Sequence, residues 1–301
     1  MPTLTDTKLT PLIKLILMGF SGKGKSTSIV PLAIPELVPN FPGYKINVFD
    51  YDGKFAEVAI NQLKLRRDSR KANRLRLIAI TEEQYKAACA NINVEVLREK
   101  TKLENGKRTI IGPPRMWEKT DRLQKQWEKE ASPNTIFVVD SWTHMCGAPL
   151  LSWAMAMQGK TLDQFGDAPH GRDYMLPQKV SKDFMAILAD SKAHVIINSH
   201  QSPTDIRMKT GEFDEKGNAV EEVVHSEMSM ISVGSAGRIQ LPSEFNHTLV
   251  VTSNTEGVRK ISTQIEDGVT TKTPFYGLAE KNYNLDTGLV EYWMLGNEPN
   301  M

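Results

Sequence analysis

Short apolar runs alternate with longer amphipathic stretches along the first 200 residues of the chain. Four of these runs have the length of buried strands: 12–18, 44–50, 135–140 and 194–200. Helices are expected at 26–37, 56–72 and 172–192, and a further strand at 75–80. This alternation of strand and helix predicts an α/β fold with a mostly parallel central sheet and helices on both faces.

Two polar segments predict additions to this core. Residues 81–131 are charged and indicate an insertion, with an Asn-Gly hairpin turn inside Glu104–Lys107 and a helix at 116–130. Residues 203–237 break the strand–helix pattern and predict a loop or β-ribbon excursion.

The last third of the chain predicts strands without intervening helices. Runs at 247–252 and 258–264, joined by a turn, predict an antiparallel β extension at the C-terminal end of the sheet. The core is then expected to span residues 1–265. Residues 266–301, rich in Gly, Asn and Pro, are expected to form a tail that packs on the core.

Composition narrows the class of protein only slightly. The 301 residues are 40% hydrophobic and 24% charged, with a net charge of +1, which argues against a surface that is basic throughout. Cys89 and Cys146 lack metal-ligand spacing and suit a reducing compartment. No apolar run is long enough to span a membrane, and the N-terminus lacks the pattern of a signal peptide. We therefore expect a cytoplasmic protein that has no membrane partner.

Residues 19–27 carry the strongest chemical signal. Gly19, Gly24, Lys25 and Ser26 satisfy the phosphate-binding pattern G-x-x-x-x-G-K-[ST], between a predicted strand and a predicted helix. Glycines let backbone N–H groups converge on phosphate oxygens, and the start of a helix adds unpaired donors. The residues expected to hold the nucleotide are Gly19, Ser21, Gly22, Lys23, Gly24, Lys25, Ser26 and Thr27. The alternative is a glycine-rich turn that matches by chance.

Asp140 is the expected second half of the nucleotide site. It ends the apolar run Ile136–Val139, on a strand expected beside the strand that leads into residues 19–27. There its carboxylate, with the Ser26 hydroxyl, is expected to hold Mg²⁺. The alternative is an acid that caps the helix after an ordinary strand.

Two further strand ends offer catalytic candidates. Asp50 and Asp52 follow the strand at 44–50, and either is expected to orient or deprotonate a water molecule, with Asp52 preferred. Asn198 and His200 end the strand at 194–200, where a polar side chain can sense the γ-phosphate, and His200 is preferred. The alternatives are turn acids and a polar strand end in solvent.

These motifs together resemble those of RecA-like P-loop ATPases. More narrowly, residues 10–265 resemble the phage-encoded AAA-type ATPases of the single-strand annealing (Sak) and RadA-like group, in which Ser follows the second motif, as at Asp140-Ser141. The resemblance implies a RecA-like P-loop nucleoside triphosphatase that uses ATP and Mg²⁺. It implies catalytic roles for Lys25 and His200, and it places Asp52 where the family usually has Glu.

The resemblance also implies partners. The family works as homo-oligomers whose ATP sites lie at subunit interfaces and receive a basic finger from the neighbouring subunit. Arg259 and Lys260 suit that role by position, with Arg207 and Arg238 as rivals. Single-stranded DNA, contacted through about residues 203–237, and a single-strand-binding protein are further implied partners, in the host cytoplasm if the protein is phage-encoded.

The expected function is therefore ATP hydrolysis in DNA recombination, annealing or replication. Residues 64–76 are the densest candidate for contacts with DNA phosphates, because they hold seven basic side chains and one acid: Lys64, Arg66, Arg67, Arg70, Lys71, Arg74, Arg76 and Asp68. The alternative is a solvated helix face, which is the more frequent origin of such a run. The alternative function is a nucleotide-gated assembly or partner-binding protein that hydrolyses little ATP, and a small-molecule kinase ranks below both.

Overall fold

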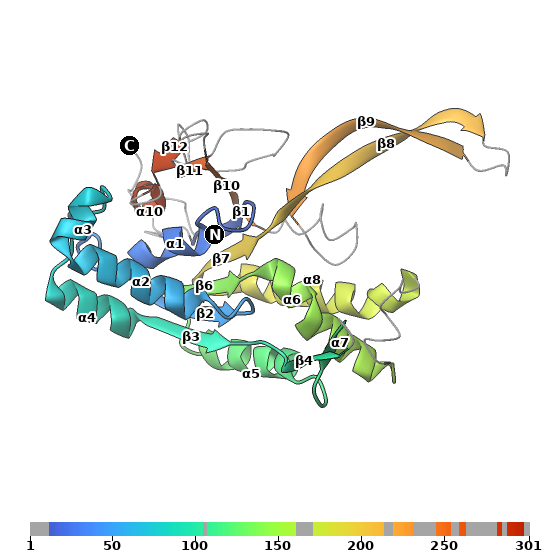
Figure 1. The fold of residues 1–301 in the computed structure, drawn as a ribbon, viewed down its shortest axis with the longest axis horizontal. Coiled ribbons are helices and arrows are strands. Elements are labelled where there is room, and N and C mark those ends of the chain that lie inside the picture. Colours follow the sequence, from blue (N-terminus) through green and yellow to red (C-terminus); the bar gives the residue numbers. More distant parts are fainter. Residues whose placement is uncertain are drawn as a thin grey trace, which may run out of the picture.

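A central sheet of eight strands organises the protein (Figure 1). The computed structural model describes residues 12–104, 107–160, 171–213, 219–230, 245–253, 259–262, 282–284 and 288–297. The strand order is β12-β11-β10-β1-β7-β6-β2-β3. The parallel strands are β1 (Lys14–Met18), β2 (Lys45–Asp50), β3 (Ile92–Val96), β6 (Thr135–Asp140), β7 (His194–Ser199) and β10 (His247–Ser253).

An antiparallel extension completes one side of this sheet. Strand β11 (Arg259–Ser262) pairs antiparallel with β10, and β12 (Asn282–Asn284) pairs antiparallel with β11. The α/β fold, the mostly parallel sheet and the C-terminal antiparallel extension predicted from the sequence are therefore confirmed.

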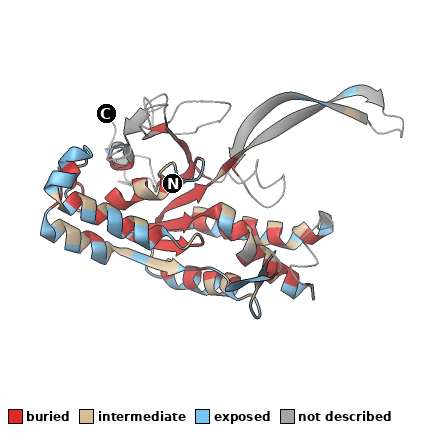
Figure 2. Ribbon diagram, in the orientation of Figure 1, coloured by how far each residue is buried: buried red, intermediate tan, exposed pale blue. Residues whose placement is uncertain are grey.

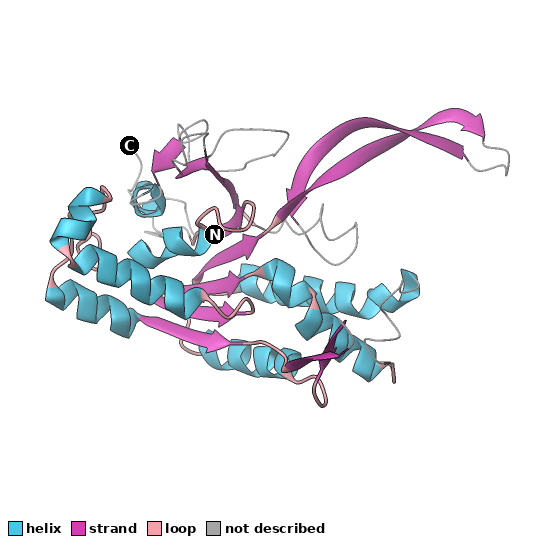
Figure 3. Cartoon of the chain, viewed as in Figure 1, coloured by secondary structure: helices cyan, strands magenta, loops and turns pink. Residues whose placement is uncertain are grey.

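Helices cover both faces of the sheet (Figure 3). One face carries α1 (Lys25–Ile29), the 3-10 helix η1 (Val30–Ala33), α2 (Phe55–Arg67), α4 (Glu82–Asn91) and α10 (Gly288–Asn297). The other carries α5 (Met116–Glu128), α6 (Trp142–Cys146), α7 (Ala148–Met157) and α8 (Met175–Asp190), which the 3-10 helix η3 (Gly171–Tyr174) precedes. The prediction of helices on both faces of one central sheet is therefore confirmed.

Alternation along the strands explains the two layers. In β1, Leu15 and Leu17 belong to the apolar cluster under α2 and α10, whereas Ile16 and Met18 belong to the cluster under α5 and α8. Successive side chains of a strand point to opposite faces, so a fully apolar strand supplies both layers. Strands β1, β6 and β7 are accordingly buried along their whole length (Figure 2). Trp293 of α10 is fully buried in the first cluster, so the tail helps to build the core.

The spatial order of the strands differs from the prediction in one respect. Strand β6, which ends at Asp140, does not neighbour β1, because β7 lies between them and pairs with both. Short apolar strands of similar composition can pair in several orders, and only the packing of the whole sheet selects one. Because β7 lies between β1 and β6, the carboxyl end of β7, at Asn198 and Ser199, lies between the phosphate loop and Asp140.

Two predicted elements were wrong. Residues 75–80 form no strand: the chain after α3 (Ser69–Arg74) turns with Arg76 at a φ of 58°, and the backbone N–H of Ile80 donates to the carbonyl oxygen of Arg66. The predicted insertion at 81–131 instead contains β3, which is the edge strand of the central sheet. An edge strand is only half buried, so β3 contains polar residues and does not appear in the sequence as an apolar run.

The helix after the phosphate loop is shorter than predicted. Helix α1 ends at Ile29, and Pro31 lies in the 3-10 turn that follows. Proline has no backbone N–H to continue an α-helical ladder. The expected hairpin is confirmed by β4 (Thr101–Glu104) pairing antiparallel with β5 (Lys107–Ile110), while Asn105 and Gly106 of its turn lie outside the described residues. The helix expected at 116–130 is confirmed as α5.

A long β-ribbon stands away from the sheet (Figure 1). Strands β8 (Gln201–Phe213) and β9 (Ala219–Met230) pair only with each other within the described residues, with Gln201 opposite Met230 and Phe213 opposite Ala219. The ribbon excursion predicted at 203–237 is therefore confirmed over the strands. Across the residues that the structure describes, no helix combines the length and apolarity needed to cross a bilayer.

Candidate functional site

The phosphate loop joins β1 to α1 at the carboxyl edge of the sheet. A Cβ atom on Gly19, whose φ is 155°, would lie 2.7 Å from the carbonyl oxygen of Val251 on the neighbouring strand β10. Gly24 caps α1 in the left-handed region, with a φ of 102°. Side chains at these two positions would strain the turn or push β10 away, so the required glycines hold the loop against the sheet.

Lys25 lies inside this loop. Its Nζ donates to the carbonyl oxygens of Gly19, at 2.6 Å, and Phe20, at 3.0 Å. Burial lowers the pKa of Lys25 to about 8, against the opposing effect of the carboxylates of Asp140 and Asp52. The group stays mostly protonated at pH 7, and its positive charge is concentrated where the loop N–H groups converge.

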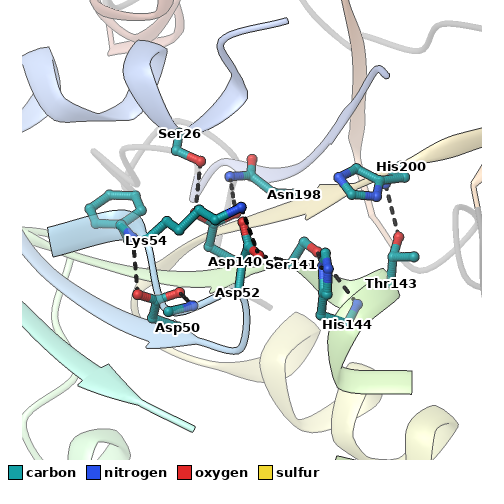
Figure 4. A network of polar contacts seen from close by, with 12 residues as sticks. Ser26, Asp50, Asp52, Lys54, Asp140, Ser141, Thr143, His144, Asn198 and His200 are labelled. Carbon is teal, nitrogen blue, oxygen red and sulfur yellow. Dashed lines mark hydrogen bonds and ion pairs between the residues drawn. The ribbon is translucent and has the colours of Figure 1, made fainter. Parts of the chain in front are cut away.

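Ser26, Asp140 and Asn198 form a row at the base of the site (Figure 4). The Ser26 hydroxyl donates to Oδ2 of Asp140 over 2.7 Å, and the Asn198 amide donates to Oδ1 of Asp140 over 3.0 Å. Burial raises the pKa of Asp140, while these two hydrogen bonds and Lys25 oppose the rise. Such a carboxyl gains from a nearby cation, because the cation replaces the lost stabilisation by water.

The two acids after β2 have different surroundings. Asp50 is fully buried, and its oxygens accept the N–H groups of Gly53, at 2.6 Å, and Phe55, at 3.0 Å. Burial raises the pKa of Asp50 to about 6, against these hydrogen bonds. Asp50 therefore holds the turn into α2, and both of its carboxylate oxygens already accept backbone N–H groups.

Asp52 is the acid that faces the site. Its side chain is 33% exposed, and its carboxylate interacts electrostatically with Lys25, Asp140 and His200. Lys54 Nζ and His144 Nε2 each lie 3.7 Å from its Oδ1 (Figure 4). Both separations exceed hydrogen-bonding distance, so Asp52 keeps its acceptor oxygens for another group.

A second polar network lines the edge next to Asp52, and the sequence reasoning missed it. The Ser141 hydroxyl lies 2.7 Å from Nδ1 of His144 and also caps α6. The backbone N–H of His200 donates to the Thr143 hydroxyl, and the rings of His144 and His200 meet edge to face at 5.4 Å. One signal in the sequence could have located His144, namely the spacing Asp140-Ser-Trp-Thr-His144. A helix that begins directly after Asp140 places the residues of its first turn near the end of the same strand.

His200 lies at this edge as expected, in an uncharged form. Burial lowers its pKa to about 4, and the positive charge of Lys25 lowers it further. It is therefore neutral at pH 7. Its backbone joins β7 directly to β8, so the residue that faces Lys25 is also the first link to the β-ribbon.

The proposed finger residues lie apart from this cluster. Arg259 pairs with Ser253 at the end of β10, and Lys260 pairs with Thr252, so both lie at the carboxyl edge, two strands from β1. Arg207 lies in β8, and Arg238 lies outside the described residues. A role in a neighbouring subunit's site stays a prediction for all four.

The basic run at 64–76 lies at the other end of α2 from the site (Figure 1). Arg66 is buried and donates to the carbonyl oxygen of Ile78, while Arg67 stacks on Tyr85 at 4.4 Å and pairs with Glu82 at 3.5 Å. Thirteen residues of helix separate the two ends, which is about 20 Å. Part of the run is therefore structural, and the remainder does not adjoin the nucleotide site.

Comparisons with known proteins add no relative to this description. No family model matches the chain, and no curated protein matches it. Function is therefore inferred from the sequence motifs and the geometry of the site.

Proposed function

We propose that this protein is a RecA-like P-loop ATPase that acts on DNA in recombination, annealing or replication. The observation that carries the nucleotide part is the 2.7 Å contact between Ser26 and Asp140, which are 114 positions apart in the chain. A loop serine and a strand-end aspartate meet where a phosphate loop requires two oxygen ligands for magnesium. The mostly parallel sheet, with its candidate groups gathered at the carboxyl edge, supports the RecA-like assignment.

The side chains present fit a magnesium–ATP complex. Ser26 and Asp140 would hold the metal, and Oδ1 of Asn198, which is buried and has no hydrogen-bond partner among the described residues, would accept from a metal-bound water. When bound, Mg²⁺ supplies positive charge to the β- and γ-phosphate oxygens. The loop from Gly19 to Thr27 would surround the phosphates with backbone N–H groups.

The hydrolytic step follows from the position of Asp52. Asp52 would orient a water molecule and accept its proton while the water oxygen bonds to the γ-phosphorus. The bond from that phosphorus to the β–γ bridging oxygen breaks, and ADP and inorganic phosphate leave. Lys25 would exchange its two loop carbonyls for phosphate oxygens and neutralise charge on the transferred group.

The proposal that the ATPase acts on DNA has less support than the proposal that it binds ATP. The resemblance to annealing and recombination ATPases motivates it, and the exposed part of the basic run offers a surface for phosphates. The alternative is a nucleotide-gated assembly protein with little hydrolysis. The near-neutral net charge of +1 and the shorter reach of Asp52, which stands where the family usually has Glu, favour that alternative.

One measurement separates the two functions. We expect magnesium-dependent ATP turnover that rises when single-stranded DNA is added, with the molecular mass measured in the same samples. Binding of single-stranded DNA should weaken with salt, with a logarithmic slope of about −0.7 for each phosphate contacted. An ATP turnover rate that stays the same with single-stranded DNA, duplex DNA or no DNA, together with a molecular mass that depends on nucleotide, would favour the assembly protein. Absence of ATP binding would contradict both.

His144 is expected to position Asp52 for this reaction. His144→Ala should lower kcat by about tenfold and leave the KM for ATP nearly unchanged, because the ring contacts Asp52 and not the phosphate loop. His144→Gln, which keeps a donor of similar reach, should recover part of the loss. Steady-state ATPase kinetics of the two variants test this role. Equal losses in both variants, or a loss confined to KM, would contradict it.

A further inference from the structure

The imidazole ring of His144 is held on three sides at the carboxyl edge of the sheet (Figure 4). Its Nδ1 lies 2.7 Å from the hydroxyl oxygen of Ser141, and its Nε2 lies 3.7 Å from Oδ1 of Asp52. The ring also meets the ring of His200 edge to face, with 5.4 Å between the two centroids. The position of the ring is therefore fixed, and its chemistry depends on which of the two nitrogens carries the proton.

The hydrogen bonds of Ser141 settle where that proton lies. As the N-cap of α6, its side-chain oxygen accepts the backbone N–H of His144 at 3.4 Å. A hydroxyl has one proton to donate. Within the described part of the chain, Nδ1 of His144 is the acceptor that this proton reaches. Ser141 is only 2% exposed, so bulk water does not compete for the proton, and the hydroxyl donates to Nδ1.

A proton on Nε2 follows from this donation. A neutral imidazole that accepts a hydrogen bond at Nδ1 carries its proton on Nε2, the nitrogen that lies next to Asp52. A carboxylate accepts hydrogen bonds, so it suits an N–H, whereas the opposite tautomer would place a lone pair against the oxygens of Asp52. The distance of 3.7 Å is long for a hydrogen bond, but such contacts in empty sites often shorten when substrate binds.

Asp52 requires a rigid partner of this kind. Its carboxylate lies one methylene nearer the backbone than that of the glutamate which RecA-like ATPases usually have there. Its other close neighbour, Lys54, has a side chain that is 70% exposed, and a flexible solvated amine orients a carboxylate poorly. His144 lies on a capped helix, and the Thr143 hydroxyl beside it accepts the backbone N–H of His200 at 2.9 Å. The ring is therefore the better anchored of the two neighbours.

We propose that Ser141 is a positioning residue for the reaction. Its hydroxyl fixes the tautomer of His144 in which Nε2 carries the proton, and that N–H holds Asp52 in the orientation that accepts a proton from the attacking water. The tautomer follows from the geometry alone. The catalytic consequence rests on the proposed function, in which Asp52 acts as the base. Ser141 contacts neither the phosphates nor the water in this scheme and acts through the ring of His144.

Side-chain ¹H–¹⁵N correlation spectra of the full chain test the tautomer without nucleotide. At about pH 8, where an ordinary imidazole is neutral, we expect the pattern of a proton on Nε2 for His144, assigned by its absence in His144→Ala. Ser141→Ala should populate both tautomers, whereas Ser141→Thr keeps the hydroxyl and should keep the pattern. A proton on Nδ1 in the unaltered chain, or an unchanged pattern in Ser141→Ala, would overturn the proposal.

ATPase kinetics test the catalytic consequence. Ser141→Ala should lower kcat about fivefold and leave the KM for ATP unchanged, because orientation of the base affects the chemical step and not binding. Ser141→Thr should recover the rate. The double variant S141A/H144A should turn over like H144A alone, since Ser141 acts through that ring. Losses that multiply in the double variant would show that Ser141 acts independently of His144, and the proposal would be wrong.

Thr81→Ala is the matched control for the loss of a helix cap. The Thr81 hydroxyl caps α4, on the opposite face of the sheet from α6, by accepting the backbone N–H of Gln84. This variant should be less stable to heat and keep its kcat, so an equal fall in kcat would attribute the effect of Ser141→Ala to the lost cap and overturn the proposal. If the unaltered chain hydrolyses no ATP, the proposed function fails and the catalytic role of Ser141 fails with it, while the spectra still decide the tautomer.

Discussion

Replacing Lys25 with alanine is expected to remove tight ATP binding. The ammonium group is the positive charge buried within the phosphate loop, held there by the carbonyl oxygens of Gly19 and Phe20. Hydrogen bonds to charged groups contribute about 1.5–3 kcal/mol each, so losing the contacts to two phosphates should weaken binding at least about 100-fold. Titration of the protein with a fluorescent ATP analogue, in the presence of Mg²⁺, measures this loss.

Lys23→Ala is the matched control for that experiment. It removes the same charge from the same loop, but Lys23 is only half buried. We expect a loss of less than about tenfold, the size of a solvent-exposed electrostatic contribution. If Lys25→Ala binds ATP as tightly as the unaltered protein, the phosphate-loop assignment is wrong.

Asp52→Asn is expected to keep ATP binding and lose turnover. The amide preserves the shape of the side chain and removes the ability to accept a proton, while Ser26, Asp140 and the loop are untouched. Loss of a general base typically lowers kcat by about 10²- to 10⁴-fold. Single-turnover hydrolysis, with ATP affinity measured in parallel, separates the chemical step from binding.

Asp52→Glu tests the same position from the other direction. Glu is the residue that RecA-like ATPases usually have at this position, and it extends the reach of the carboxylate by one methylene. Turnover should therefore be retained or raised. Normal turnover in Asp52→Asn would move the base to another residue. Asp50 is a poor substitute, because both of its oxygens accept backbone N–H groups of the turn into α2.

The preference for Asp52 over Asp50 was partly predictable. Residues two apart in an extended chain share a side, so the sequence grouped the two acids correctly with the strand end. The two acids differ in function because the backbone N–H groups of Gly53 and Phe55, in the turn after β2, donate to the carboxylate of Asp50. The sequence placed the start of α2 within one residue of Phe55, but the apolar pattern does not indicate which side chain accepts the N–H groups of the turn.

The polar side chains around Asp140 were the least predictable part of the site. Asn198 was the weaker sensor candidate by sequence, yet its amide contacts the Asp140 carboxylate because β7 is inserted beside β6. His144 was missed, although its spacing from Asp140 places it in the first turn of a helix that begins at the same strand end. Both roles depend on which strands and helices become neighbours, and that choice is made by packing across the whole sheet.

The sequence by itself determined the local conformations and the division of the core. The glycines of the phosphate loop, the apolar alternation of the strands and the Asn-Gly turn act through neighbouring backbone atoms, which any reading along the chain includes. Tertiary structure alone decided the strand order and the partners of Asp140. Those features arise when segments far apart in the chain bury their apolar faces together, and many pairings satisfy the same local pattern.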